Sequence, residues 1–147
     1  MAYLDHENLD VYHVAIEFLP AANRIADAFP RGYSWLADQL RRAATSIFLN
    51  IAEGAGEFSG KEKARFYRMA KRSATESAAI LDAWRASGSP VEHGDELSSA
   101  RDRIVRIVSM LVRMVQRVEQ GHGVGHGQGH GQGHARARES DARTSGT

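Results

Sequence analysis

The sequence predicts an all-α fold, an up-down-up-down four-helix bundle with a disordered tail rich in glycine and histidine. Apolar residues recur at helical spacing along most of the chain, and no segment alternates apolar and polar residues for long enough to form a strand. With 147 residues, 42% of them hydrophobic, the chain suffices for one core rather than two. We therefore expect one bundle over residues 1–119 and a separate tail over residues 120–147.

The first two helices are expected on either side of a turn at Pro30. The first should run from about Asn8 to Ala28, and Pro20 should kink it or divide it in two, because proline lacks the backbone N–H. Ser34 is expected to cap the second helix, which should end in the glycine-rich stretch of residues 54–60. The apolar face of this second helix is expected to include Phe58.

The third and fourth helices are expected over about 61–87 and 95–119, separated by a Gly-Ser-Pro turn. Phe66 and Met69 are among the residues that should face inward from the third helix. On the fourth, apolar residues spread over more than one face, which exceeds what burial in a single bundle requires and favours an oligomer. These residues are Ile104, Ile107, Val108, Leu111, Val112, Val115 and Val118.

A polar line on the second predicted helix is the most informative feature of the chain. At about 100° per residue, its five side chains fall within roughly 80° of one another, beside the apolar face. Half-buried polar groups need partners, so one of the arginines at 41 and 42 is expected to pair with Glu53 or Glu76. The line is predicted to be a structural network or a subunit interface. It consists of Gln39, Arg42, Ser46, Asn50 and Glu53.

The same region carries a family resemblance. Residues 39–59, QLRRAATSIFLNIAEGAGEFS, contain an Arg-Arg pair followed by Ser, Asn and Ile-Ala-Glu-Gly. Together with the flanking helices, residues 5–119 resemble a bacterial four-helix bundle family. The first members of that family were found in intervening sequences of large-subunit ribosomal RNA genes and were labelled ribosomal proteins. The resemblance implies the same bundle here.

That family is similar to the accessory variability determinant of diversity-generating retroelements, a pentamer with a basic surface that works with a reverse transcriptase and nucleic acid. The resemblance thus implies a homo-oligomer, by analogy a pentamer, with RNA or DNA and a nucleic-acid-processing protein as partners. Three positions differ from the family pattern: Phe48 replaces a usual proline, Glu57 a basic residue and Arg72 a small residue. The acidic residue at 57 argues against a simple transfer of nucleic-acid binding.

Charge is distributed unevenly along the expected bundle. Residues 1–60 hold eight acidic and four basic side chains, and residues 61–119 hold eight acidic and twelve basic ones. Basic side chains at helical spacing can follow a phosphate backbone without a base-reading motif, although a solvated helix face gives the same pattern. The sequence therefore predicts two candidate nucleic-acid contacts. One stripe is Lys61, Arg65, Arg68 and Arg72 on the third helix, and the other is Arg106, Arg113 and Arg117 on the fourth.

Beyond Gln120 the composition changes abruptly, with glycine at every second position through Gly133. Each glycine costs about 1 kcal/mol in a helix, and the run has no apolar surface to offset chain entropy. A disordered tail is therefore expected. Histidines recur in it every four residues, which suggests an alternative function as a binder or buffer of Zn, Ni or Cu ions. They are His122, His126, His130 and His134.

The composition also excludes several function classes. There is no cysteine, so disulfides, thiolate catalysis and cysteine-based zinc sites are excluded. The chain lacks an apolar run of about 18 residues and a basic-then-apolar leader, so we expect no membrane span and a cytoplasmic location. Because hydrolase, phosphate-loop and di-metal motifs are missing, we expect neither catalysis nor a cofactor. The predicted function is that of a non-catalytic, oligomeric scaffold or accessory protein.

Overall fold

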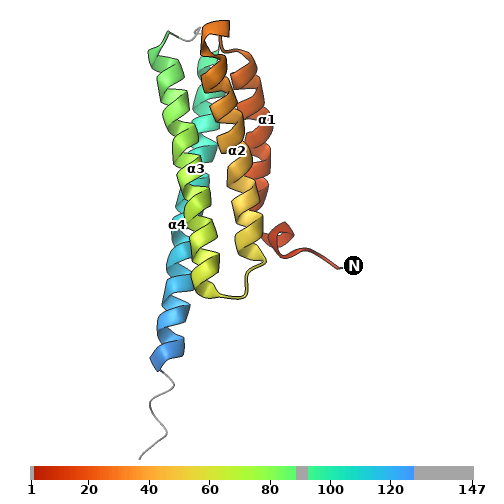
Figure 1. Cartoon of the computed structure of the whole chain (residues 1–147), viewed down its shortest axis with the longest axis vertical. Helices are drawn as coiled ribbons and strands as arrows, with labels where there is room; N and C mark the ends of the chain where they lie inside the picture. Colours follow the sequence, from red (N-terminus) through yellow and green to blue (C-terminus); the bar gives the residue numbers. More distant parts are fainter. Residues whose placement is uncertain (1, 89–92, 128–147) are drawn as a thin grey trace, which may run out of the picture.

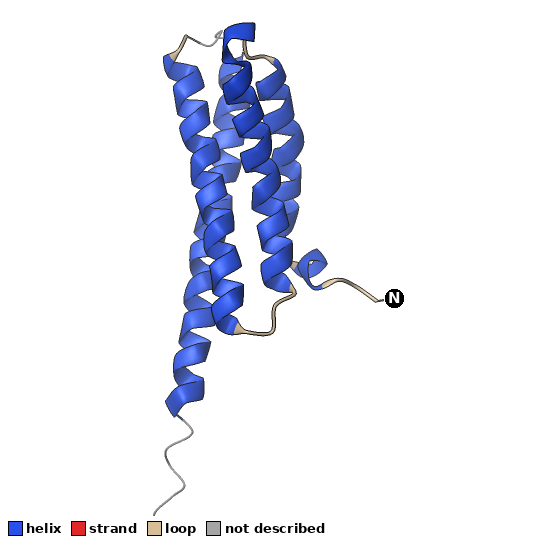
Figure 2. Cartoon of the chain, viewed as in Figure 1, coloured by secondary structure: helices blue, strands red, loops and turns tan. Residues whose placement is uncertain are grey.

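Four long helices make up the protein in a computed structural model that describes residues 2–88 and 93–127, with side chains as far as Gly121. The helices are α1 (Asp10–Asp27), α2 (Ser34–Ala55), α3 (Gly60–Ala86) and α4 (Gly94–Gly127). Two short 3-10 helices, η1 (Asp5–Asn8) and η2 (Arg31–Tyr33), precede α1 and α2. Throughout the described ranges the chain is helix and loop without strands (Figure 2). The predicted all-α fold with four helices is confirmed.

Each helix runs antiparallel to the one before it and packs against two others (Figure 1). Contacts join α1 to α2, α2 to α3, α3 to α4 and α4 back to α1, so the four lie in chain order around the core. One end of the bundle therefore holds the starts of α1 and α3, the end of α2 and the last turns of α4. We refer to it as the lower end, as it is drawn in Figure 1.

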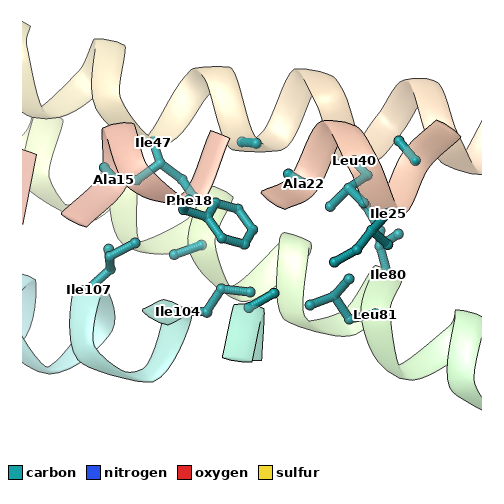
Figure 3. Packing of buried hydrophobic residues seen from close by; sticks show 14 of the residues in the cluster. Ala15, Phe18, Ala22, Ile25, Leu40, Ile47, Ile80, Leu81, Ile104 and Ile107 are labelled. Carbon is teal, nitrogen blue, oxygen red and sulfur yellow. The ribbon is translucent and has the colours of Figure 1, made fainter. Parts of the chain in front are cut away.

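The core is mostly aliphatic, with Phe18 of α1 near the middle of the packing shown in Figure 3, and it also includes Phe29, Tyr67 and Trp84. Apolar residues at helical spacing give each helix one buried stripe, which removes apolar surface from water at roughly 25 cal/mol per Å². Ile25 of α1 lies near Leu40 of α2 in the same layer (Figure 3). The largest side chains with less than 2% exposure include Phe18, Ile25, Leu40, Ile47, Ile51, Ile104, Ile107 and Leu111.

A division of α1 at Pro20 and a cap at Ser34, two of the expected features, are not observed. Pro20 lies on the exposed side of an uninterrupted α1, so the helix is not divided. Proline removes one backbone bond there, and the buried side chains of Phe18, Ala21 and Ala22 hold the helix together on both sides of it. Ser34 is the first residue of α2 rather than its cap. Tyr33 takes the cap position without a side-chain hydrogen bond.

The buried face of α3 differs from the expected one near the start of the helix, whereas the expected inward residues farther along are buried: Ala70, Ser73, Ser77, Ile80 and Trp84. Tyr67 is 3% exposed, whereas Met69 is 37% exposed and Phe66 is half-buried. Tyr67 reaches the core because it faces Gly54 of α2, where the two helices lie very close. A Cβ atom added to Gly54 would stand 2.7 Å from Cε1 of the Tyr67 ring. Burial raises the pKa of the Tyr67 phenol, and the nearby carboxylate of Asp5 raises it further.

The α2–α3 loop is held at both ends. Lys63 Nζ donates to the carbonyl oxygens of Gly54 at 2.9 Å and Ala55 at 3.0 Å, which satisfies acceptors that the end of α2 leaves free. Ser59 caps α3 by accepting a hydrogen bond from the Glu62 amide. Phe58 lies in this loop and is fully exposed, so its expected place on the apolar face of α2 was wrong.

The fourth helix is longer than expected. It continues past Glu119 to Gly127 and extends beyond the α2–α3 loop at the lower end (Figure 1). The expectation that glycines stop the helix near residue 120 was therefore wrong as far as Gly127. An existing helix gains a backbone hydrogen bond with each added residue, which offsets part of the cost of glycine. Residues 128–147, with the rest of the expected tail, lie outside the described residues.

The apolar surplus of α4 is mostly half-buried against the core. Val108, Val115 and Val118 pack on its edge. Among the described residues of α4, Val105 is the large hydrophobic residue that is exposed, at 51%. Across the described ranges, the bundle has no helix with the length and apolarity needed to cross a bilayer.

Candidate nucleic-acid interface

Helix α3 presents a row of cations along the lower half of its outer face. The predicted residues Lys61, Arg65, Arg68 and Arg72 are all exposed, and Lys71 is exposed beside them. The residues of this row are spaced three or four apart, so successive cations rise by about 5–6 Å along the helix axis. We call Lys61, Arg65, Arg68, Lys71 and Arg72 the α3 basic surface.

Two cations of the α3 basic surface are paired within the chain. Arg65 lies 2.9 Å from the carboxylate of Glu62 and places its guanidinium 4.5 Å from the centre of the Phe66 ring. Arg68 forms an ion pair with Glu119 of α4. These pairs are half exposed, so water and salt screen them and each contributes little to stability.

The other three cations have no carboxylate within ion-pair distance in the described part of the chain. They are Lys61 at the lower end of the row, and Lys71 and Arg72 at its upper end, near the middle of α3. Lys71 and Arg72 line a shallow hollow of about 340 Å³ together with Arg68 and Thr75. Sequence reasoning missed Lys71 because it lies about 80° from the row on the helix, and only a three-dimensional hollow joins it to Arg72.

The stripe on α4 does not merge with the α3 basic surface. Arg106, Arg113 and Arg117 are exposed, and Arg113 and Arg117 line a hollow of about 430 Å³ with the start of α1. The side of α4 that faces α3 instead carries Val118 and Glu119, which line a smaller hollow with Lys61 and Arg68. The predicted α4 stripe therefore lies toward α1, whereas the α3 basic surface lies on the other side of α4, beside Val118 and Glu119.

The polar line on α2 divides into a bonded centre and exposed ends. The Asn50 side-chain amide donates to the Ser46 carbonyl at 2.8 Å and hydroxyl at 2.9 Å, and the Ser73 hydroxyl of α3 lies 2.8 Å from that of Ser46. Gln39, Arg42 and Glu53 are exposed. The centre is thus a contact between α2 and α3, and an interface role of the line stays a prediction.

The predicted pairing of an α2 arginine with Glu53 or Glu76 was wrong. Arg41 turns toward α1 and pairs with Asp27 at 2.6 Å and with Asp38 at 3.3 Å. Glu53 and Glu76 are exposed. Arg42 lines a shallow hollow of about 410 Å³ on the outer face of α2. The other residues of this hollow include Thr45, Ser46, Leu49 and Asn50.

The structure describes only part of the segment that carries the four histidines. His122 and His126 lie on the last turns of α4, where side chains are not described, and His130 and His134 lie outside the described residues. In the part of the bundle that is described, no three acidic or histidine side chains come close enough together to hold a metal ion. The metal interpretation therefore stays a prediction about the tail.

Comparison with known proteins agrees with the resemblance seen in the sequence. A family model described as the 23S rRNA-intervening sequence protein matches residues 7–113, which cover all of α1, α2 and α3 and much of α4. Comparison with curated proteins gives no match. The matched range includes the α2 polar line and the whole α3 basic surface. The chain therefore belongs to the 23S rRNA-intervening sequence protein family.

Proposed function

We propose that the protein is a non-catalytic accessory protein that binds the backbone of RNA or DNA through the α3 basic surface. The observation that carries this proposal is the exposure of Lys61, Lys71 and Arg72 without a carboxylate partner in the described ranges. Phosphate binding needs such point charges and no base-reading motif. Membership in a family named for intervening sequences of ribosomal RNA supports a role beside nucleic acid.

We further propose that the protein acts as a homo-oligomer, by the family resemblance a pentamer, that joins several copies of this surface. The outer face of α2 supports assembly because it exposes apolar side chains beside an arginine that has no ion pair among the described residues. Trp35 is 58% exposed, Leu49 is 53% exposed and Arg42 lies between them. Linked copies would bind one nucleic acid more tightly than a single protomer, since the second contact becomes intramolecular.

The test is filter binding of RNA and of duplex DNA at 50–200 mM salt, a range over which phosphate contacts weaken steeply. The double variant Lys71→Gln/Arg72→Gln removes the two cations at the upper end of the surface, which have no ion pair in the described ranges. We expect the slope of log affinity against log salt to become shallower by about 1.4–1.8 per bound protomer, from about 0.7–0.9 for each lost phosphate contact. Circular dichroism should show an unchanged helix content.

A matched control has the same loss of charge at the other end of the bundle. Arg31→Gln/Arg85→Gln changes two exposed arginines of η2 and the end of α3. This control should keep the wild-type slope. Equal slopes for the two double variants, or the absence of wild-type binding at 50 mM salt, would show that α3 does not bind nucleic acid.

A further inference from the structure

The most exposed large hydrophobic side chain of the described chain is Phe58, at 105%. Its ring therefore makes no packing contact that shields it from water. Burying a phenylalanine contributes about 1.5–3 kcal/mol, so full exposure forgoes a stabilising contact. Single exposed apolar residues are common, and the surroundings of Phe58 decide what it can bind.

The loop that carries Phe58 is fixed rather than loose. Before it, the Gly56 amide donates to the Ala52 carbonyl and the Glu57 amide donates to the Gly54 carbonyl. After it, Ser59 caps α3, and the Lys63 ammonium ties the start of α3 to the end of α2. A ring held on such a rigid loop loses little conformational entropy when a partner covers it.

The start of the α3 basic surface follows Phe58 within one helical turn. Lys61 lies in the first turn of α3, is exposed, and has no carboxylate within ion-pair distance in the described ranges. With Arg68 it lines a small hollow of about 150 Å³ at this end of the helix. A flat apolar ring next to a row of cations matches a chain that carries flat bases on an anionic backbone.

We propose that Phe58 stacks on an unpaired base of a single-stranded nucleic acid whose phosphates lie along the α3 basic surface. This inference rests on the proposed function and adds a preference for unpaired segments, since a paired base inside a duplex cannot reach the ring. Stacking on an aromatic ring is tolerant of sequence because every base has a π face. The bound segment is thus a loop, bulge or single strand.

The carboxylate of Glu57 opposes this binding. It directly precedes Phe58 and repels a phosphate placed beside the ring. Glu57→Gln should therefore tighten binding of a single strand.

The experiment compares Phe58→Ala, Phe58→Leu and Phe58→Trp with the wild type. The probe is a single-stranded RNA of about 12 nucleotides that carries fluorescent 2-aminopurine, with the DNA of the same sequence and the RNA duplex as parallel probes. We expect Phe58→Ala and Phe58→Leu to weaken single-strand binding about 5- to 100-fold and to abolish quenching of the base fluorescence. Phe58→Trp should restore both, and duplex affinity should change less than about twofold.

The outcomes separate this inference from the function on which it rests. If the Lys71/Arg72 variant loses affinity while Phe58→Ala binds single strands like the wild type, the stacking role is wrong and the proposed function stands. If the wild type binds none of the probes, both are wrong. If Phe58→Ala changes the sedimentation of the free protein, Phe58 is a contact between copies of the chain, and the stacking role is overturned.

Discussion

Replacing Gly54 with alanine tests how closely α2 and α3 approach at the Ile-Ala-Glu-Gly sequence. The new Cβ would lie 2.7 Å from Cε1 and 2.9 Å from Cδ1 of Tyr67, and 3.1 Å from Cβ of Phe66. Real Cβ atoms essentially never come within 3.0 Å of a heavy atom from another part of the structure. The ring has little room to move because Tyr67 is only 3% exposed. The helices must therefore separate, or the ring must leave its place in the core.

Two opposing effects set the magnitude. Alanine is favoured over glycine by about 1 kcal/mol inside a helix, and by less in the last turn of α2, where Gly54 lies. Overpacking a close-packed core costs about 1–3 kcal/mol. We therefore expect Gly54→Ala to lower the free energy of unfolding by about 1–2 kcal/mol. At a slope near 2 kcal/mol per M, the urea midpoint would fall by roughly 0.5–1 M.

Gly56→Ala is the matched control for this substitution. A Cβ atom there meets nothing closer than backbone oxygens at 3.8 Å, so the midpoint should stay near that of the wild type or rise. In a Tyr67→Val background both ring carbons are absent, and the cost of Gly54→Ala should shrink. A wild-type midpoint for Gly54→Ala, or the same cost in both backgrounds, would refute the close-approach argument.

Three further predictions concern the same end of the bundle and its assembly. Lys63→Met removes two charged hydrogen bonds to the end of α2 and should cost about 1–2 kcal/mol in urea titration, whereas Lys61→Met should change stability by less than about 0.5 kcal/mol. The raised pKa of Tyr67 keeps its phenol protonated in the folded state at a pH where the unfolded chain ionises. The contribution of the Tyr67 phenol to the free energy of unfolding is thus fully present below about pH 10 and is lost as the pH rises further. Tyr67→Phe should reduce this loss of stability at alkaline pH, and an equal loss in both proteins would contradict the argument. Sedimentation equilibrium should give a multiple of the 16.1 kDa protomer mass, and a monomer at tens of micromolar would contradict assembly.

The fold could be predicted because it follows from local patterns in the sequence. Apolar residues at helical spacing and the breaks near residues 30, 56 and 88 predict four helices in the observed order. Gly88 adopts φ = +85° just after α3, a conformation that favours glycine. Pro20 was misjudged because its ring lies on the solvent side of α1, where the loss of one hydrogen bond does not break the packed face.

The inward residues near the start of α3 were predicted wrongly because the sequence offers two adjacent aromatic residues there. Phe66 and Tyr67 both fit a helical apolar stripe, and hydrophobicity alone favours Phe66. The choice depends on Gly54, which leaves space for one ring and lies on the preceding helix, across the α2–α3 loop. The predicted pairing of an α2 arginine with Glu53 was wrong for a related reason. Arg42 and Glu53 share a helix face, and that face points to solvent in the single chain.

The candidate site shows the same difference between counting charges and placing them. Residues 61–72 contain six cations in the sequence, but Lys63 binds the carbonyls of α2, and Arg65 and Arg68 pair with Glu62 and Glu119. Three remain without such a partner in the described ranges.

The salt dependence of binding distinguishes three available cations from six. If a phosphate contact contributes about 0.9 to the salt slope on duplex DNA, these three give about 2.7 per protomer, against about 5.4 for all six. A measured slope near the larger value would mean that phosphates displace the carboxylates and even the α2 carbonyls, so that binding would loosen the α2–α3 loop. A slope near the smaller value would mean that the ion pairs persist and that α3 binds nucleic acid without changing the bundle.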